Sequence, residues 1–463
     1  MVVVSAVFLL VAGGLAAVYL TANRREVTTS SAAAYQAYRE GVENDRRFYK
    51  KEARVLYARA LSLDPNFVMA MIRLAGLSNQ EQARALLDRA RKLRSRTNER
   101  ERLYVDMATA QEKGKREDVL RIAREIREKY PDDVDCAMIL AGNEMLEGRA
   151  EQAIQVFSDL LAKDPNNAAV YNSVGYYYAW RGDYDKAIEN LRRYQFMAPD
   201  QANPYDSLGE VQAYSGRYDE AMANLNKALS LKSDFFESTF HLGVVYEGKG
   251  DFAKAIEYYE KASGEALTDN RRAELLFSAL RVALLSGDRS AAREVVARVA
   301  ELPKGKNTEV WHAASEVALD LVDGRITDAE RRLTELKPKL HAAYEKGAEG
   351  SQRKPHFPYW NALMERVKEA QGKTDEAIAL CELNANPPNP WDTFEGRRWV
   401  YEARARLAAL VARQGNLDRA EKLLAENKKW NPNWAPTRPA ELAVEQLRRD
   451  KVLAASGGSA APR

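Results

Sequence analysis

Histidine and cysteine are the side chains whose spacing would first reveal a metal site or a nucleophilic active site. The chain has 463 residues with four histidines and two cysteines. No HExxH pair occurs among the histidines. Cys136 and Cys381 lack the CxxC spacing that zinc or a c-type haem requires, so we interpret both as buried small hydrophobes. The histidines are His241, His312, His341 and His356, which we interpret as surface or packing residues.

Glycine-rich phosphate loops are also missing, because neither GxxxxGK[ST] nor GxGxxG occurs in the chain. We therefore predict a protein that is not an enzyme, with no catalytic residue, no metal and no cofactor. The aromatic stretch 171–191, YNSVGYYYAWRGDYDKAIENL, is the remaining chemical candidate. It could be a ligand platform or simply part of a core, and the choice depends on whether the same pattern recurs.

The pattern recurs with a period of 34 residues. Small residues follow the repeated glycines at a fixed distance of five, and fixed self-similarity of this length indicates stacked supersecondary units. The glycines are Gly114, Gly148, Gly182, Gly216 and Gly250, and the following residues are Val119, Ala153, Ala187, Ala221 and Ala255.

One unit, residues 168–201, predicts two helices. The first carries an apolar stripe with i, i+3, i+4, i+7 spacing, Gly182-Asp183 interrupts it, and Pro199 ends the second. Neither helix can bury its stripe alone, so neighbouring units must stack into a solenoid. The stripe residues are Tyr171, Val174, Gly175, Tyr178, Ala187, Leu191 and Tyr194.

These residues resemble the tetratricopeptide repeat (TPR), whose pattern of aromatic, Leu-Gly, Tyr, Gly, Ala and Pro fills 34 positions. The likeness covers about residues 34–435 in about eleven units, and Gly-x4-Ala persists at Gly287, Gly324, Gly372 and Gly415. It implies an all-α, right-handed α-solenoid of helix-turn-helix hairpins. The expected domains are a transmembrane anchor (1–25), N-terminal TPR-like units (26–98), a regular array (99–269), degenerate units (270–336), a linker (337–357), C-terminal degenerate units with a terminal helix (358–453) and a disordered tail (454–463).

The stretch from Val2 to Ala22 contains no charge. Its residues span about 30 Å as a helix, the thickness of a bilayer core. We predict a retained, single-pass membrane anchor, with a cleaved signal peptide as the main alternative. Arg24 and Arg25 then place the following chain in the cytoplasm by the positive-inside rule, with a periplasmic location as the alternative. Small-residue pairs such as Ala12/Ala16 offer a homo-oligomer contact within the membrane.

Charge argues against nucleic acid as a partner, because 70 basic and 67 acidic residues leave a net charge of only +3. The basic run 89–102 could touch lipid headgroups. We favour a solvated helix end, with Asn98 and Glu101 forming a capping box at the start of the next helix.

By the resemblance, first-helix positions outside the core line a concave groove for a protein segment, extended or helical. The lysine and asparagine clamp that holds a chaperone's C-terminal carboxylate in some relatives is absent, and the groove suits an apolar or mildly basic segment. The alternative is that the helix 439–453 of this chain fills the groove. The groove residues are Met138, Met145, Leu146, Asn172, Tyr176, Trp180, Asp206, Glu210, Tyr214, Phe240 and Val244.

Tryptophans gather near the C-terminus, where they either contact a partner or fill gaps in irregular repeats. We favour the second interpretation. They are Trp360, Trp391, Trp399, Trp430 and Trp434.

The leading prediction is a membrane-anchored TPR scaffold or adaptor, an accessory subunit or assembly factor of a membrane complex. The alternative is the sensor or interaction part of a bacterial signalling protein, such as a serine/threonine kinase, whose catalytic domain lies outside this chain. The stretch 96–105, RTNERERLYV, motivates this alternative, since it resembles segments in the repeat regions of such proteins.

Overall fold

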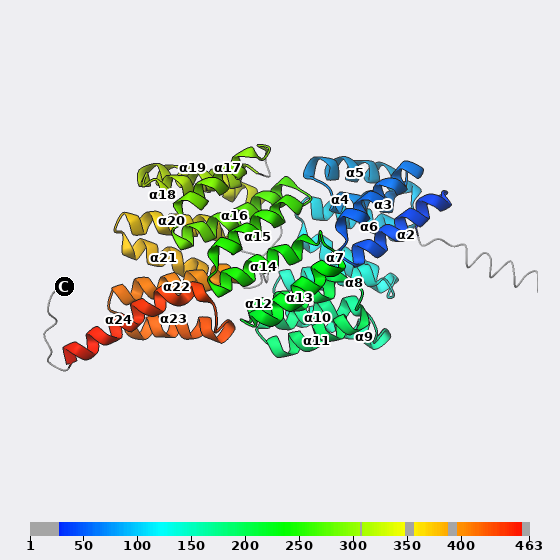
Figure 1. The fold of residues 1–463 in the computed structure, drawn as a ribbon. Helices are drawn as coiled ribbons and strands as arrows, with labels where there is room; N and C mark the ends of the chain where they lie inside the picture. The colour runs from blue at the N-terminus through cyan, green and yellow to red at the C-terminus, as the bar shows by residue number, and fades with distance from the viewer. Residues whose placement is uncertain (1–26, 306–307, 348–355, 388–395, 456–463) are drawn as a thin grey trace, which may run out of the picture. The chain divides into compact units, whose positions relative to one another are not determined.

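The computed structural model describes residues 27–305, 308–347, 356–387 and 396–455, and every regular element within these ranges is a helix (Figure 1). The all-helical, solenoid-like fold expected from the repeat is confirmed. The helices are α2 (Ala32–Arg46), α3 (Lys50–Leu63), α4 (Val68–Gly76), α5 (Gln80–Leu93), α6 (Glu99–Glu112), α7 (Arg116–Lys129), α8 (Val134–Leu146), α9 (Ala150–Lys163), α10 (Ala168–Arg181), α11 (Tyr184–Met197), α12 (Ala202–Tyr214), α13 (Tyr218–Leu231), α14 (Phe236–Lys249), α15 (Phe252–Glu265), α16 (Asp269–Ser286), α17 (Arg289–Glu301), α18 (Glu309–Val322), α19 (Ile326–Gly347), α20 (Pro358–Ala370), α21 (Thr374–Ala385), α22 (Arg397–Arg413), α23 (Leu417–Trp430) and α24 (Arg438–Ala455), with short 3-10 helices η1 (Arg94–Arg96) and η2 (Ala435–Thr437).

The repeated glycines form the turn inside each hairpin. Gly182 ends α10 with φ of 81°, and the Asp183 side chain then accepts a hydrogen bond from the backbone N–H of Lys186 to cap α11. A left-handed φ favours glycine because it has no Cβ to clash with the following carbonyl. Gly114, Gly148, Gly216, Gly250, Gly287, Gly324, Gly372 and Gly415 also have positive φ, between 71° and 83°.

The α2–α3 hairpin departs from this rule in a way that the sequence did not reveal. Its turn places Phe48 at φ of 62°, five residues before Ala53, where the sister turns have glycine. Phe48 is the one non-glycine residue with positive φ in the described part of the chain. The hairpin therefore keeps the shape of the repeat without its usual residue.

Close helix contacts inside a hairpin depend on small residues, as the repeat predicted. A Cβ on Gly175 of α10 would lie 2.6 Å from Cγ of Leu191 on α11, so only glycine fits there. Ala187 is fully buried at the same crossing. These contacts fix the pairing of α10 with α11.

The described chain divides into two compact units. The first, residues 1–113 with 121–131, packs Tyr38, Tyr57 and Phe67 together, with Tyr38 and Phe67 ring centroids 4.9 Å apart. The second, residues 114–120 with 132–463, contains a core that extends from α10 to α22. The predicted groove lies in this second unit.

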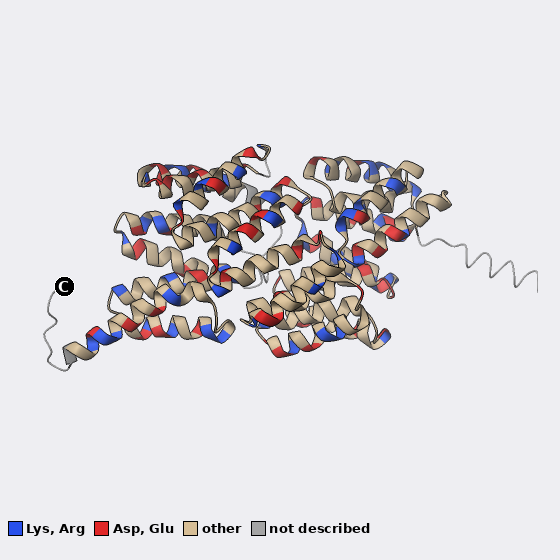
Figure 2. Cartoon of the chain, viewed as in Figure 1, with Lys and Arg blue, Asp and Glu red and all other residues tan. Residues whose placement is uncertain are grey.

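The basic run 89–102 belongs to the first unit. The capping box is confirmed: Asn98 Oδ1 accepts from the Glu101 N–H at 2.9 Å, and the Asn98 N–H donates back to the Glu101 carboxylate at 3.2 Å. Arg91 pairs with Glu112, and Arg94 makes a two-pronged contact with Asp106. This is the geometry of a solvated helix end. Figure 2 likewise shows basic and acidic residues interspersed along the helices of each unit.

One boundary differs from the sequence prediction. The linker was expected to begin at residue 337, yet α19 continues to Gly347 and includes Pro338 within its length. The remaining domain boundaries stay predictions, and most of the expected tail, residues 456–463, lies outside the described residues.

The predicted membrane location is contradicted. Within the ranges that the structure describes, no helix has the length and apolar character needed to cross a bilayer. The segment predicted as the anchor, residues 2–22, lies outside the described residues, so the cytoplasmic or periplasmic assignment built on it is withdrawn.

Candidate functional site on the inner helices

The predicted groove residues divide into a covered and an open set. Seven are buried: Asn172, Trp180, Asp206, Glu210, Tyr214, Phe240 and Val244. Four are only half-buried and define what we call the open groove patch: Met138, Met145 and Leu146 on α8, with Tyr176 on α10.

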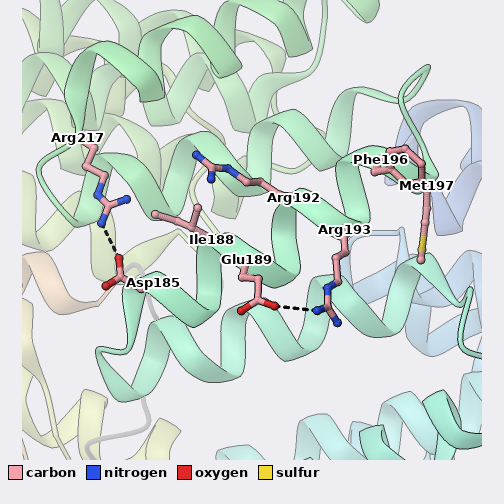
Figure 3. Close-up of a pocket in the computed structure, with 8 residues that line it drawn as sticks. All are labelled: Asp185, Ile188, Glu189, Arg192, Arg193, Phe196, Met197 and Arg217. Carbon is pink, nitrogen blue, oxygen red and sulfur yellow. Dashed lines mark hydrogen bonds and ion pairs between the residues drawn. The ribbon is translucent and has the colours of Figure 1, made fainter.

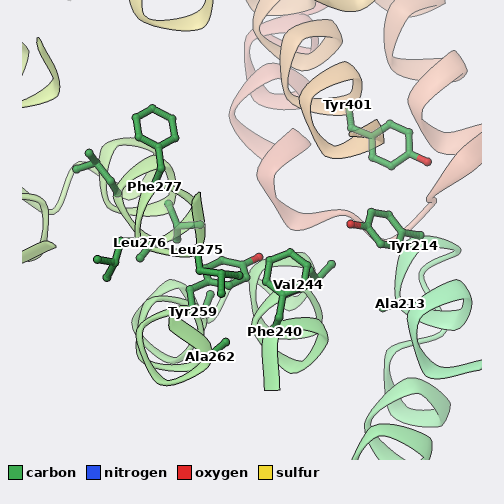
Figure 4. Close-up of a cluster of buried hydrophobic side chains, with 14 of the residues drawn as sticks. Ala213, Tyr214, Phe240, Val244, Tyr259, Ala262, Leu275, Leu276, Phe277 and Tyr401 are labelled. Carbon is green, nitrogen blue, oxygen red and sulfur yellow. The ribbon is translucent and has the colours of Figure 1, made fainter. Parts of the chain in front are cut away.

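The buried apolar members belong to the core. Figure 4 draws Tyr214, Phe240 and Val244 in one buried cluster with Phe277 of α16 and Tyr401 of α22. Tyr214 and Val244 have no exposed surface at all. The sequence was wrong to expect these positions on an open surface, because all three side chains are buried in the core.

Helix α22 closes the middle of the groove with a charged residue. Arg398 donates from Nη1 to the Tyr259 hydroxyl at 2.8 Å, and its guanidinium lies 5.0 Å from the Phe240 ring centroid. Glu247 of α14 lies 3.6 Å from the same guanidinium and neutralises it. A buried arginine is tolerated only when it is paired and stacked in this way.

The segment after α23 covers the turn between α12 and α13. Asn431 accepts from the Tyr218 hydroxyl at 3.2 Å and donates to the Ala213 carbonyl at 3.3 Å. Asn433 donates to the Gly216 carbonyl at 3.0 Å. Backbone carbonyls that would otherwise face solvent are therefore satisfied by this chain's own side chains.

The residues of this chain that contact the groove positions lie in α22 and in the segment after α23, not in the segment named for self-occupation. The expected helix, residues 439–453, lies within α24, which packs on α22 and α23. Trp434 and Trp360 are buried, and Trp399 and Trp430 are half-buried against the core. The burial of these four tryptophans agrees with the interpretation that they fill gaps between irregular repeats. Trp391 lies outside the described residues.

The two groove acids are engaged by neighbouring helices. Tyr176 donates its hydroxyl to Glu210. Asp206 accepts from the Ser238 hydroxyl at 2.7 Å, and His241 Nδ1 lies 2.9 Å from the same oxygen. His241 Nε2 is 3.6 Å from Glu210. The expectation that these acids attract a mildly basic segment is therefore not supported by their surroundings.

This polar cluster perturbs two ionisable groups. Burial raises the pKa of Tyr176 well above its ordinary value, and the charges of Glu210 and Asp206 add to the effect. Burial, with Asp206 as the next cause, raises the pKa of Glu237 to about 7. The open groove patch therefore contains a phenol that stays neutral, and the Glu237 carboxyl titrates near neutrality beside Asp206.

His241, Ser238 and Glu237 were not recognised as groove-side residues from the sequence. The repeat register could have indicated His241, because it directly follows the predicted groove residue Phe240. Its interpretation as a packing residue fits its burial. Among the described residues, no group of histidine, cysteine or carboxylate side chains has a geometry suited to a metal ion.

Asn172 is the remaining polar group of the groove. Its side chain is buried, and no donor among the described residues reaches its Oδ1. Because buried polar atoms are nearly always hydrogen-bonded, this acceptor needs an explanation.

Comparison with known families supports the repeat assignment. A family model described as TPR repeat matches residues 209–250, and models described as tetratricopeptide repeat match residues 145–204 and 236–266. No curated protein sequence matches the chain.

Among solved structures, the chain is similar to a crystal structure of MamA at 25% identity, covering 34% of this chain and 93% of that chain, with a TM-score of 0.29. It is similar to the Cut9–Hcn1 hetero-tetramer of the APC/C at 16% identity, covering 89% and 76%, with a TM-score of 0.44. A tetratricopeptide repeat protein from Parabacteroides merdae is 12% identical, covering 59% and 98%, with a TM-score of 0.40.

Proposed function

We propose that this chain, a tetratricopeptide-repeat protein, is a non-catalytic scaffold that binds an extended, largely apolar segment of a partner protein on the open groove patch. The observation that carries the proposal is the contrast in exposure along the inner helices. The chain's own residues cover the groove positions of α12 and α14, whereas Met138, Met145, Leu146 and Tyr176 stay half-exposed.

The chemistry of the patch suits an apolar segment. Methionine side chains are flexible and polarisable, so they adapt to the shape of a partner. Tyr176 adds an aromatic surface, and its hydroxyl is fixed by Glu210, which reduces the entropy lost on binding. The patch therefore offers adaptable contacts beside one rigid ring.

Asn172 does not contribute to this surface. It lies on α10, one helical turn before Tyr176, but its side chain and its Oδ1 are buried, so a partner segment does not reach it. Sequence preference therefore comes from the methionines and the Tyr176 ring. Because the groove acids are already engaged, we propose an apolar rather than a basic segment.

The test is selection of short random peptides displayed on phage against the full chain, followed by affinity measurement on the enriched peptides. Met138→Gln and Met145→Gln should each weaken binding about tenfold, the effect of losing about 1.4 kcal/mol. Met222→Gln is the matched control, because Met222 is a half-buried methionine of the second-helix row on α13.

Thermal unfolding of the three variants separates binding from folding. The proposal requires that Met222→Gln binds like the wild type and that the patch variants unfold at similar temperatures. Enriched peptides that bind all three variants as tightly as the wild type would refute it, and so would enrichment of basic peptides only.

A further inference from the structure

A surface hollow of about 530 Å³ lies on the outer side of α11 and reaches Arg217 before α13 (Figure 3). Its apolar part consists of Ile188, Phe196 and Met197. The second helix of each hairpin carries no residue of the inner groove, so this hollow is separate from the open groove patch. Its volume is within the range of sites that hold a peptide side chain or small ligand.

The stability of the fold does not explain why a large aromatic residue occupies position 196. Its surface is 85% exposed, so it gains almost nothing by burial. The residues at the same repeat position, 34 residues apart, are Ala162, Ser230 and Gly264. Sister hairpins therefore fold with a small residue at this point, and a large aromatic side chain here has another use.

Arg192 departs from its sister positions in the same way, since these hold Ser158, Asn226 and Glu260. The other charges that line the hollow are paired: Asp185 with Arg217 at 2.8 Å and Glu189 with Arg193 at 2.7 Å.

Within the described ranges, Arg192 forms no ion pair, so the lining of the hollow has one uncompensated positive charge. Figure 3 shows its side chain extending toward Ile188, with Phe196 at the other end of the hollow. A guanidinium in this position can bind a carboxylate with two parallel hydrogen bonds.

We propose that this hollow docks an acidic and apolar segment of a partner protein. An aliphatic or aromatic side chain of the partner packs on Phe196 and Met197, and an adjacent aspartate or glutamate pairs with Arg192. Aromatic residues and arginine are enriched at protein interfaces relative to the rest of the surface. The proposal extends the scaffold function to a second surface, and it does not depend on occupancy of the groove.

The sister repeats supply variants that the fold accepts. Phe196→Ser and Arg192→Asn install the residues found at positions 230 and 226. Lys261→Asn is the control for net charge, because Lys261 is an exposed cation on α15. Met145→Gln is the control for the groove.

The probes are two pools of short peptides, one built from Asp, Glu, Leu, Phe, Gly and Ser, the other with Lys and Arg in place of the acids. Each pool is passed over the immobilised full chain, and affinities are measured for the retained peptides. We expect retention of the acidic pool, about tenfold weaker binding to Phe196→Ser, and loss of the acid preference in Arg192→Asn. Lys261→Asn and Met145→Gln should bind like the wild type.

The opposite results would overturn the proposal. These are retention of neither pool, equal retention of both, or peptides that bind Phe196→Ser as well as the wild type. Peptides whose binding is lost in Met145→Gln instead occupy the groove, which would support the scaffold proposal and contradict this one.

Discussion

Arg281 of α16 links α14 and α22 through two ion pairs. Replacing it with methionine tests whether these ion pairs are shielded from water. Its side chain is 5% exposed and contacts two carboxylates, Glu247 of α14 and Glu402 of α22, the latter at 2.7 Å. The guanidinium also lies 5.5 Å from the Trp399 ring centroid. A methionine side chain at this position would fill much of the volume but would leave both carboxylates without this cation.

The expected loss of stability depends on which cations stay close to the two carboxylates after Arg281 is removed. Removing one partner of a buried ion pair costs about 3–5 kcal/mol. Here Glu247 keeps Arg398 at 3.6 Å, and Glu402 keeps Arg366 at 3.4 Å, so the loss should lie near the lower end, about 3 kcal/mol. Burial acts to raise the pKa of Glu402, but Arg281 and Arg366 outweigh it and hold that pKa below its ordinary value.

Hydrogen exchange is the suitable assay, because repeat arrays open locally rather than as one cooperative block. Amides of α22 in Arg281→Met should lose about a hundredfold in protection, the equivalent of about 3 kcal/mol. The difference should shrink as the pH falls through the lowered pKa of Glu402, since a protonated carboxyl no longer requires a cation.

Arg293→Met is the matched control. Arg293 pairs with Asp323 at 2.6 Å, but its side chain is half-exposed, and such pairs contribute about 0–1 kcal/mol. An equal effect of the two variants, or a loss below about 1 kcal/mol in Arg281→Met, would refute the claim that the α16–α22 contact is desolvated.

Two further predictions concern a turn and a titrating acid. Gly182→Ala should lower the unfolding temperature more than Gly287→Ala. Both glycines have positive φ, but only at Gly182 would an added Cβ overlap a neighbouring side chain, the ring of Trp430. Equal effects of the two variants would contradict the contact between Gly182 and Trp430. Glu237→Gln should leave stability unchanged near pH 4 and raise it by up to roughly 3 kcal/mol above pH 7. Burial and then Asp206 raise the pKa of Glu237 from 4.5 to about 7, while His241 and Arg271 act to lower that pKa. The wild type therefore loses stability as the pH rises from 4.5 to 7, because only the unfolded chain releases the proton in this range. Urea unfolding across pH checks this, and parallel curves for the two proteins would refute it.

The hairpins could be predicted from the sequence because their determinants are local. Gly182 needs a left-handed turn, Gly175 must admit Leu191, and Asn98 with Glu101 caps a helix, all within 20 residues of chain. Interactions at this range repeat with the sequence, so a fixed period reveals them. The same reasoning missed Phe48, because the turn geometry persists when glycine is replaced and only the backbone angle reveals it.

The state of the groove could not be predicted in this way. Whether Phe240 is covered depends on Arg398 of α22, and whether the Gly216 turn is free depends on Asn433. Both of these residues come much later in the chain. Such contacts arise from the small rotation that each hairpin adds to the next, a sum that no single repeat encodes.

The sequence by itself thus determined an array of helical hairpins similar to tetratricopeptide repeats and which residues each hairpin buries, because those choices are made between neighbours in the chain. The tertiary structure alone decided which inner positions stay open for a partner. It left Tyr176 and the α8 methionines partly accessible while burying Phe240 and Val244, since only the accumulated path of the helices brings Arg398 of α22 against Phe240.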